Sequence, residues 1–148
     1  MKRYLYPLGI IVTLLASLTI PQIAFAGRAN GNVTAKTISG KTIVARSSVV
    51  TSNWAWAFQS AYCATTAVNA GHIGCLARLY NNSGALMDST GWGYNANYLS
   101  KADEFVTTAA YDGAVGTSYY SYGMSSGWNG NGYTSFTSNR SPNQTIES

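Results

Sequence analysis

Short stretches rich in Val, Thr, Tyr, Trp and Phe recur along this chain, and clusters of Gly, Asn, Asp and Ser separate them. β-branched and aromatic residues pack well on a pleated surface, whereas Gly, Asn and Asp favour turns. Three junctions share one form, an aromatic residue followed by Asn or Asp and soon by Gly: Tyr80-Asn81, Tyr111-Asp112 and Trp128-Asn129. Helical periodicity is confined to a weak stretch at 98–111, where residues 98–102 are compatible with one turn. The pattern predicts an all-β fold of about seven or eight short strands.

The strand boundaries follow from these turn signals. A first hairpin is expected to join Val33–Ile38 to Lys41–Val50 through a turn at Ser39-Gly40. Short strands in one small domain pack as an antiparallel β-sandwich or barrel, and the uneven strand lengths favour the sandwich. Residues 141–148 are expected to form a frayed tail. The remaining strands are expected at Trp54–Thr66, Ile73–Tyr80, Ala85–Tyr94, Glu104–Tyr111, Thr117–Trp128 and Tyr133–Ser138.

Cys63 and Cys75 are the two thiols of the sequence. If strands 54–66 and 73–80 pair around Asn69, the cysteines face each other directly, small residues share one face and larger apolar residues share the other. In an oxidising compartment an isolated pair of this kind forms a disulfide. The alternative, a redox-active pair, normally has the tighter Cys-x-x-Cys spacing. The sequence therefore predicts one structural disulfide.

Residues 1–26 have the form of a secretory signal peptide. Two basic residues begin the segment, Leu8–Ile20 forms its apolar core, and Ala24-Phe25-Ala26 is a small-x-small cleavage site. The apolar core is short for a transmembrane span, although an uncleaved membrane anchor is the alternative. Cleavage would leave residues 27–148 as a single secreted β domain, extracellular and without a membrane span.

The charge and the metal-binding residue types narrow the classes of function. Without the leader, seven basic and five acidic residues remain, for a net charge of +2. The basic residues are scattered, without a cluster that could follow a phosphate backbone, so nucleic acid is not an expected partner. One histidine and two cysteines are too few for a four-ligand zinc site, and phosphate-binding glycine motifs are missing. No metal or cofactor is therefore expected.

The titratable residues give little support for catalysis. Neighbouring Asp103 and Glu104 would point to opposite faces of a strand, and Asp112 precedes a glycine in a turn. His72 is the single candidate for proton transfer and is expected to be an exposed loop residue; no Gly-x-Ser-x-Gly elbow is present. The protein is therefore not expected to be an enzyme. A secreted hydrolase that pairs His72 with a carboxylate is the alternative.

Aromatic residues are the clearest functional feature of the chain, at 13% of its residues. Strand alternation places two of the tyrosines of the Tyr-Tyr-Ser-Tyr segment on one face and the third on the other. A supply of Tyr, Ser, Gly and Asn with little charge is typical of adaptable binding surfaces. The alternative is that the aromatic rings fill a core that is short of Leu and Ile. The candidate binding residues are Trp54, Trp56, Tyr119, Tyr120, Tyr122 and Trp128.

Four segments carry a resemblance to small, largely uncharacterised secreted proteins of Gram-positive bacteria. They are Gly74–Gly84 (GCLARLYNNSG), Trp92–Asn95 (WGYN), Tyr119–Gly123 (YYSYG) and Asn129–Phe136 (NGNGYTSF). The resemblance implies a fold and a secreted location but almost no activity. The chain also resembles the lactococcin-type bacteriocins, which fold as small β-sandwiches behind a cleaved leader; this similarity implies interference with cell-wall synthesis in related bacteria. The chain departs from that pattern in its longer mature part, its cysteine pair and its histidine, and no site residue transfers from either group.

The sequence as a whole favours a non-enzymatic secreted protein that binds at the bacterial cell surface through exposed aromatic residues. The expected partner is a cell-wall glycan or another envelope component. One alternative is a bacteriocin-like toxin that acts on the envelope of related bacteria. Another is a structural matrix component that assembles through an uncapped sheet edge.

Overall fold

A computed structural model describes residues 27–147, and the predicted leader, residues 1–26, lies outside the described residues. Over the described range the chain is all-β and contains no helix, and every strand pairing is antiparallel. The strands are β1 (Gly27–Asn30), β2 (Thr34–Ile38), β3 (Lys41–Thr51), β4 (Ala55–Cys63), β5 (Ile73–Leu76), β6 (Arg78–Asn81), β7 (Leu86–Ser89), β8 (Gly93–Tyr94), β9 (Phe105–Tyr111), β10 (Ser118–Ser121), β11 (Met124–Trp128), β12 (Tyr133–Thr137) and β13 (Gln144–Thr145).

The first layer is a five-stranded sheet in the order β1-β3-β4-β9, in which β2 also pairs with β3. β2 and β1 lie one after the other along the same edge of β3. The predicted first hairpin is confirmed as β2 and β3. Its turn residues, Ser39 and Gly40, have φ values of 47° and 76°. Two successive positive φ angles define the turn type that matches the twist of a two-residue hairpin.

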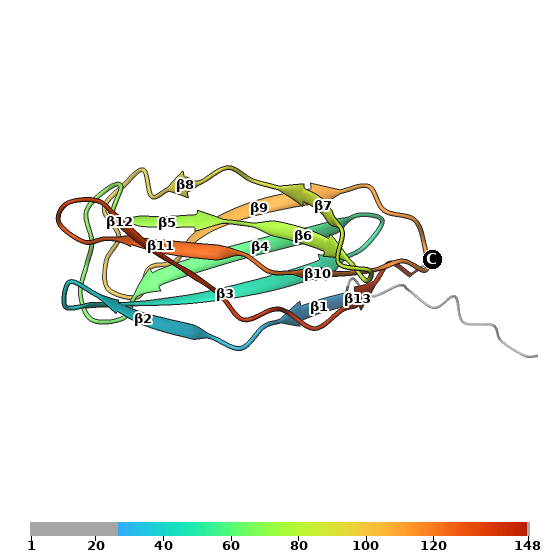
Figure 1. Ribbon diagram of the computed structural model, residues 1–148, viewed down its shortest axis with the longest axis horizontal. Helices are drawn as coiled ribbons and strands as arrows, with labels where there is room; N and C mark the ends of the chain where they lie inside the picture. Colours follow the sequence, from blue (N-terminus) through green and yellow to red (C-terminus); the bar gives the residue numbers. More distant parts are fainter. Residues whose placement is uncertain (1–26, 148) are drawn as a thin grey trace, which may run out of the picture.

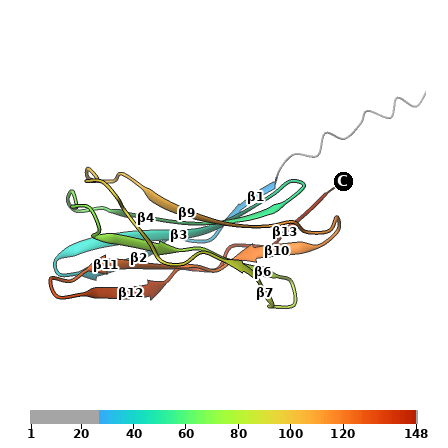
Figure 2. The ribbon, with the colours of Figure 1, turned by 90° about the horizontal axis from the view of Figure 1, so that it is seen from above.

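The second layer consists of two four-stranded sheets placed end to end, β12-β11-β5-β8 and β13-β10-β6-β7. The register continues across the break between them: Tyr120 is opposite Tyr80 in one sheet, and Ser125 is opposite Cys75 in the other. Figure 1 shows β5 and β6, and likewise β11 and β10, following each other along the long axis, and Figure 2 shows the two layers in side view. The predicted sandwich is therefore correct, and the barrel alternative is not formed.

Two hydrophobic clusters fill the space between the layers. One contains Val49, Leu79 and Ile146, and the other contains Ile43 and Ile73, together with smaller buried residues. The inward positions of β4 are mostly alanine and are completely buried. Small side chains on this central strand allow the two sheets to approach closely, so the larger side chains of the facing strands supply most of the apolar surface.

A buried polar network lies at the break in the second layer. The Gln59 side chain reaches across the sandwich from β4, where its Oε1 accepts a hydrogen bond from Ser47 Oγ (2.7 Å). Its Nε2 donates to Ser125 Oγ (2.8 Å) and Ser138 Oγ (2.6 Å), and the Gly123 N–H donates to Ser47 Oγ (2.9 Å). All four of these side chains are at most 2% exposed. The network therefore satisfies backbone and side-chain groups that would otherwise be buried without partners.

The predicted disulfide is wrong, because Cys63 and Cys75 are both free and buried. β4 pairs with β3 and β9, so Cys63 lies opposite Ile43 in the first layer. β5 belongs to the second layer, where Cys75 lies opposite Ser125. The predicted register between the two strands satisfied the alternation of small and large residues. Alternation, however, determines which face a residue occupies and does not determine which strand is its partner.

The two thiols differ in acidity. Burial, reinforced by the charge of Glu104, raises the pKa of the Cys75 thiol to about 12, although Ser125 opposes this effect through a hydrogen bond. Burial also acts to raise the pKa of Cys63, but hydrogen bonds from Thr65 and the nearby backbone, with the charge of Lys41, outweigh it and lower that pKa.

We therefore expect protein that has not been treated with a reductant to show two titratable thiols when it is unfolded. The folded protein should react slowly with a thiol reagent. Cys63 should react before Cys75, because the thiolate is the reactive species and the Cys75 thiol has the higher pKa. Labelling with a chromogenic disulfide at pH 8, with and without denaturant, measures both quantities. If no titratable thiols were found in the unfolded protein, the two cysteines would form a disulfide and this expectation would be wrong.

Two further expectations are corrected. Residues 141–147 are not a frayed tail, since β13 pairs with β10 and Ile146 is 1% exposed within the core. Ser141 is also buried, and its Oγ accepts a hydrogen bond from the Ser121 N–H (2.9 Å). The weak helical signal at 98–102 corresponds to a turn in which Leu99 forms an isolated β-bridge with Val68. In both places a single apolar residue anchors a segment whose neighbours are polar.

Candidate functional site

The six candidate binding residues do not form one site. Tyr119 is 2% exposed and belongs to the core. The residues before and after it in β10 face the outer side of the second layer, as strand alternation predicts. Trp54 and Trp56 are exposed at the outer side of the first layer, with ring centroids 6.2 Å apart. Tyr120 and Trp128 lie on the outer face of the second layer, near its two ends, and Tyr122 lies on that face as well.

The largest connected group of exposed rings lies on the outer face of the second layer, around β8, β11 and β12. We call it the aromatic platform. The centroids of neighbouring rings are 6.3 Å apart for Trp92–Tyr94, 4.6 Å for Tyr94–Tyr133, 5.3 Å for Tyr133–Trp128 and 6.1 Å for Trp128–His72. Trp92 and Tyr94 are each 37% exposed and Tyr133 is 44% exposed, so the platform presents a broad aromatic surface.

Gly74 makes this arrangement possible. It lies on β5 between Tyr94 on β8 and Ser126 on β11. A Cβ atom added at Gly74 would come within 2.7 Å of the Tyr94 ring and 2.4 Å of Ser126 Oγ. The missing side chain therefore lets the Tyr94 ring lean across β5 towards Tyr133, which lies on β12 at the opposite edge of the same sheet. Close approach of other groups to the backbone is a recurrent reason for glycine inside a strand.

A buried asparagine fixes the loop at the His72 end of the platform. Asn95 is 2% exposed, and its Oδ1 accepts a hydrogen bond from the Ile73 N–H (2.8 Å). Its Nδ2 donates to the carbonyl oxygens of Asn69 (2.9 Å) and Asn97 (2.8 Å). Tyr133 Oη donates to the Gly71 carbonyl (2.7 Å) and so ties the platform to the same loop. These bonds hold the rings in place before any ligand arrives.

Two buried polar atoms at the platform have no hydrogen-bond partner among the described residues: His72 Nδ1 and Ser126 Oγ. His72 is half-buried against Trp128, which corrects the expectation of an exposed loop residue. Burial, and then the charge of Lys41, lower the pKa of His72 below its ordinary value. The ring is therefore neutral at pH 7 and contributes to the aromatic surface.

Two carboxylates bind backbone amides and are not part of the platform. Asp88 Oδ2 accepts a hydrogen bond from the Ala110 N–H (2.9 Å), and Asp103 Oδ2 accepts one from the Ser100 N–H (2.8 Å). Both carboxylates thus stabilise backbone groups. Within residues 27–147, no group of three or more His, Cys, Asp or Glu side chains is placed to hold a metal ion.

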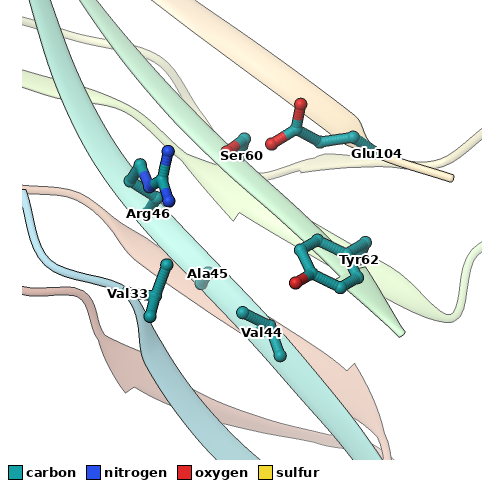
Figure 3. Close-up of a pocket in the computed structure, with 7 residues that line it drawn as sticks. All are labelled: Val33, Val44, Ala45, Arg46, Ser60, Tyr62 and Glu104. Atoms are coloured by element: carbon teal, nitrogen blue, oxygen red, sulfur yellow. The ribbon is translucent and has the colours of Figure 1, made fainter. Parts of the chain in front are cut away.

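The opposite face of the molecule has a small pocket on the outer side of the first layer. Figure 3 shows the carboxylate of Glu104 and the guanidinium of Arg46 on the two sides of Ser60, with Tyr62 and Val44 towards the other end. Its volume is about 120 Å³. Sites for small organic ligands are usually about 300–1,000 Å³, so this pocket is too small for a sugar unit.

The sequence prediction included Trp128 but missed the other members of the platform. Trp92 and Tyr94 are two residues apart, so strand alternation places their rings on one side, and this signal was available. The contribution of Tyr133 and His72 depends on the pairing of β11 with β5 and β12 and could not be derived from local pattern.

No protein-family model matches the chain, and no characterised protein matches it in sequence. Among solved structures, the chain is similar to part of a β-glucuronidase from glycoside hydrolase family 2, with a TM-score of 0.34 and 11% identity over 84% of this chain. The matched part is 12% of that enzyme's chain. A likeness of this degree gives no information on activity. In the part of the chain from 27 to 147, no helix has the length and apolar character needed to cross a bilayer.

Proposed function

We propose that this protein is a secreted, non-enzymatic binder of bacterial cell-wall glycan and that the aromatic platform is its binding surface. One observation carries the proposal: Trp92, Tyr94, Tyr133 and Trp128 form a connected chain of rings on the outer face of a sheet, and three of them are more than a third exposed. A connected set of exposed rings of this kind marks an interaction surface.

The chemistry of the platform suits sugar rings. A pyranose presents C–H groups on its faces, and these groups carry a slight positive charge. The face of an aromatic ring is negative, so the two surfaces attract each other while both lose contact with water. Tyr94, Tyr133 and Trp128 project from paired strands, and glycine and asparagine contacts fix their neighbours. Little conformational freedom of these rings therefore remains to be lost on binding.

Co-sedimentation of residues 27–148 with purified Gram-positive cell walls tests the proposal. Retention in the pellet, and release by soluble wall fragments, are expected. Trp92→Ala and Tyr94→Ala should each weaken binding about tenfold or more, because a well-placed aromatic contact contributes at least 1–2 kcal/mol.

Trp56→Ala is the matched control. Trp56 is also 37% exposed, but it projects from the first layer on the opposite side of the sandwich. Its replacement should leave wall binding within about twofold of the original value, a free-energy change below about 0.5 kcal/mol. Loss of binding in Trp56→Ala with unchanged binding in Trp92→Ala would move the site to the first layer. A protein that stays wholly in the supernatant would refute glycan binding.

A further inference from the structure

A second group of aromatic rings lies on the same outer face, at the other end of the second layer. Tyr80 and Tyr120 face each other across β6 and β10 with stacked rings 5.2 Å apart, and Tyr122 is 6.5 Å from Tyr80. The Arg140 guanidinium lies 3.5 Å from the centre of the Tyr120 ring. We call these four residues the tyrosine–arginine cluster.

The cluster and the aromatic platform belong to one continuous surface. Tyr120, Tyr122 and Trp128 share the outward face of a nearly continuous strand, since the register is the same in both halves of the second layer. Tyr122 and Trp128 are six residues apart, which corresponds to roughly 20 Å along a strand. A single monosaccharide cannot span that length, whereas several units of a linear chain can.

The Arg140 guanidinium is held in one orientation by its contacts. Its Nη2 donates to Asn143 Oδ1 (2.6 Å), and Asn143 in turn donates to Asn82 on the β6–β7 turn. Stacking on Tyr120 and this bond fix the plane of the guanidinium, which has five N–H donors in all. Arg140 is exposed, so its remaining donors are available to solvent or to a ligand.

Arg140 also lines an open groove between the segment 30–32 and the segment 140–142. It has a volume of about 310 Å³ and is lined by Asn30, Gly31, Asn32, Arg140, Ser141 and Pro142. The volume is at the lower end of the usual range for small-ligand sites, and the lining combines two asparagines, a serine and one cation with Gly31 and Pro142. A fixed planar guanidinium binds carboxylate and phosphate groups through two parallel hydrogen bonds. An acidic group is therefore the ligand group that suits Arg140 best.

We propose that the outer face of the second layer binds an extended, linear acidic glycopolymer, with sugar units on the aromatic platform and an acidic group at Arg140. The inference rests on the proposed function and adds to it a chain-like ligand and a negative charge. Asp88 and Asp103 are bound to backbone amides and Glu104 lies on the other layer, so these three carboxylates do not compete for Arg140.

The test compares Arg140→Gln with Arg28→Gln in binding to purified Gram-positive walls at low salt. Arg28 is a close counterpart, because its guanidinium also lies over an aromatic ring, that of Phe58 at 5.9 Å, but on the first layer. Arg140→Gln should bind about five- to tenfold more weakly, and Arg28→Gln should bind like the unmodified protein. The difference should largely disappear at about 1 M salt, where charges are screened beyond about 3 Å.

Arg140→Lys separates charge from structure. It keeps the cation and loses the planar group that stacks on Tyr120, so retention of most of the binding supports a role in recognising charge. An equal loss in Arg140→Lys and Arg140→Gln that persists at about 1 M salt would assign Arg140 a structural role and overturn the inference. Wild-type binding by Arg140→Gln would overturn it too. Neither result would affect the platform, which the Trp92→Ala variant tests independently.

Two treatments of the walls distinguish the possible sources of the acidic group. Hydrofluoric acid removes phosphodiester-linked polymers, and carbodiimide coupling to an amine neutralises carboxylates. The inference expects one treatment to reduce binding of the unmodified protein to the level of Arg140→Gln, and that treatment identifies the group. If the ratio between the two proteins stays the same after both treatments, the ligand is neutral and the inference fails.

Discussion

Gln59→Met is expected to lower the free energy of unfolding by about 3–5 kcal/mol, which is a large part of the 5–15 kcal/mol typical of a small domain. Methionine is unbranched and close in size, so the change mainly removes hydrogen bonds. Ser47 loses its acceptor, and Ser125 and Ser138 lose their donor, while all three remain buried. A buried polar group without a partner destabilises by about 1–3 kcal/mol.

Guanidinium chloride unfolding followed by tryptophan fluorescence measures the loss, with the slope against denaturant checked for two-state behaviour. Ser60→Met is the control on the same strand, because Ser60 lines the pocket on the outer side of the first layer. Its effect should stay within about 0.5 kcal/mol. The triple variant Gln59→Met, Ser125→Ala, Ser138→Ala should recover part of the loss, since it removes stranded hydroxyl groups. A loss below about 1 kcal/mol in Gln59→Met would show that the network contributes little to stability.

The same network marks a limit of sequence-based reasoning. Alternation places Ala55, Ala57 and Ala61 on one face of β4, and the structure shows that this face is inward and that Gln59 belongs to it. A polar residue at such a position is compatible either with a wrong strand assignment or with a buried partner. Its partners lie 12, 66 and 79 residues away, so local pattern could not choose between these possibilities.

Strand partners were the least predictable part of the fold. The strands and turns of the first hairpin, and the turn that precedes Tyr133, follow from turn chemistry and are confirmed. The pairing of β4 with β5 was wrong because the chain crosses between layers after Cys63, and no local signal distinguishes a crossing from a hairpin. At the break between the two sheets of the second layer, the Gly123 N–H donates to Ser47 in the other layer and not to a neighbouring strand, and this is a tertiary contact.

The aromatic residues show the same division between local and tertiary information. Enrichment in aromatic residues pointed to a binding surface, and Trp128 belongs to the largest exposed group of rings. Tyr119, in contrast, is a core residue, because the position next to Tyr120 on a strand faces the opposite layer. Which face of a strand is inward depends on the layer that packs against it. It can therefore be assigned from the sequence only after the topology is known.

Gly74→Ala is expected to reduce wall binding about tenfold or more and to lower the free energy of unfolding by about 1–3 kcal/mol. The new Cβ would lie 2.7 Å from the Tyr94 ring and 2.4 Å from Ser126 Oγ, and no carbon atom is tolerated at such distances. The position has no left-handed φ, so the effect comes from space and not from backbone conformation. The Tyr94 ring must move away from β5, and its contact with Tyr133 is then lost.

Gly91→Ala is the control, because it lies next to Trp92 and an added Cβ there meets no atom within 4 Å. Its binding and stability should match those of the unmodified protein. Both variants are measured by co-sedimentation with cell walls and by denaturant unfolding. Unchanged wall binding in Gly74→Ala, with normal binding in Gly91→Ala, would mean that the position of the Tyr94 ring does not matter for the ligand.

A double-mutant cycle between Gly74→Ala and Tyr94→Ala tests whether the clash with the Tyr94 ring causes the loss of stability and of wall binding. In the Tyr94→Ala background the ring is gone, so the added methyl group meets only Ser126. Gly74→Ala should then destabilise less than it does in the unmodified protein, and the difference is the coupling energy of the pair, about 0.5–3 kcal/mol for residues in contact. Wall binding should not fall further, because Tyr94→Ala has already removed the ring that Gly74→Ala displaces. Additive losses of binding would instead show that Gly74 affects the ligand directly, through close approach to the β5 backbone.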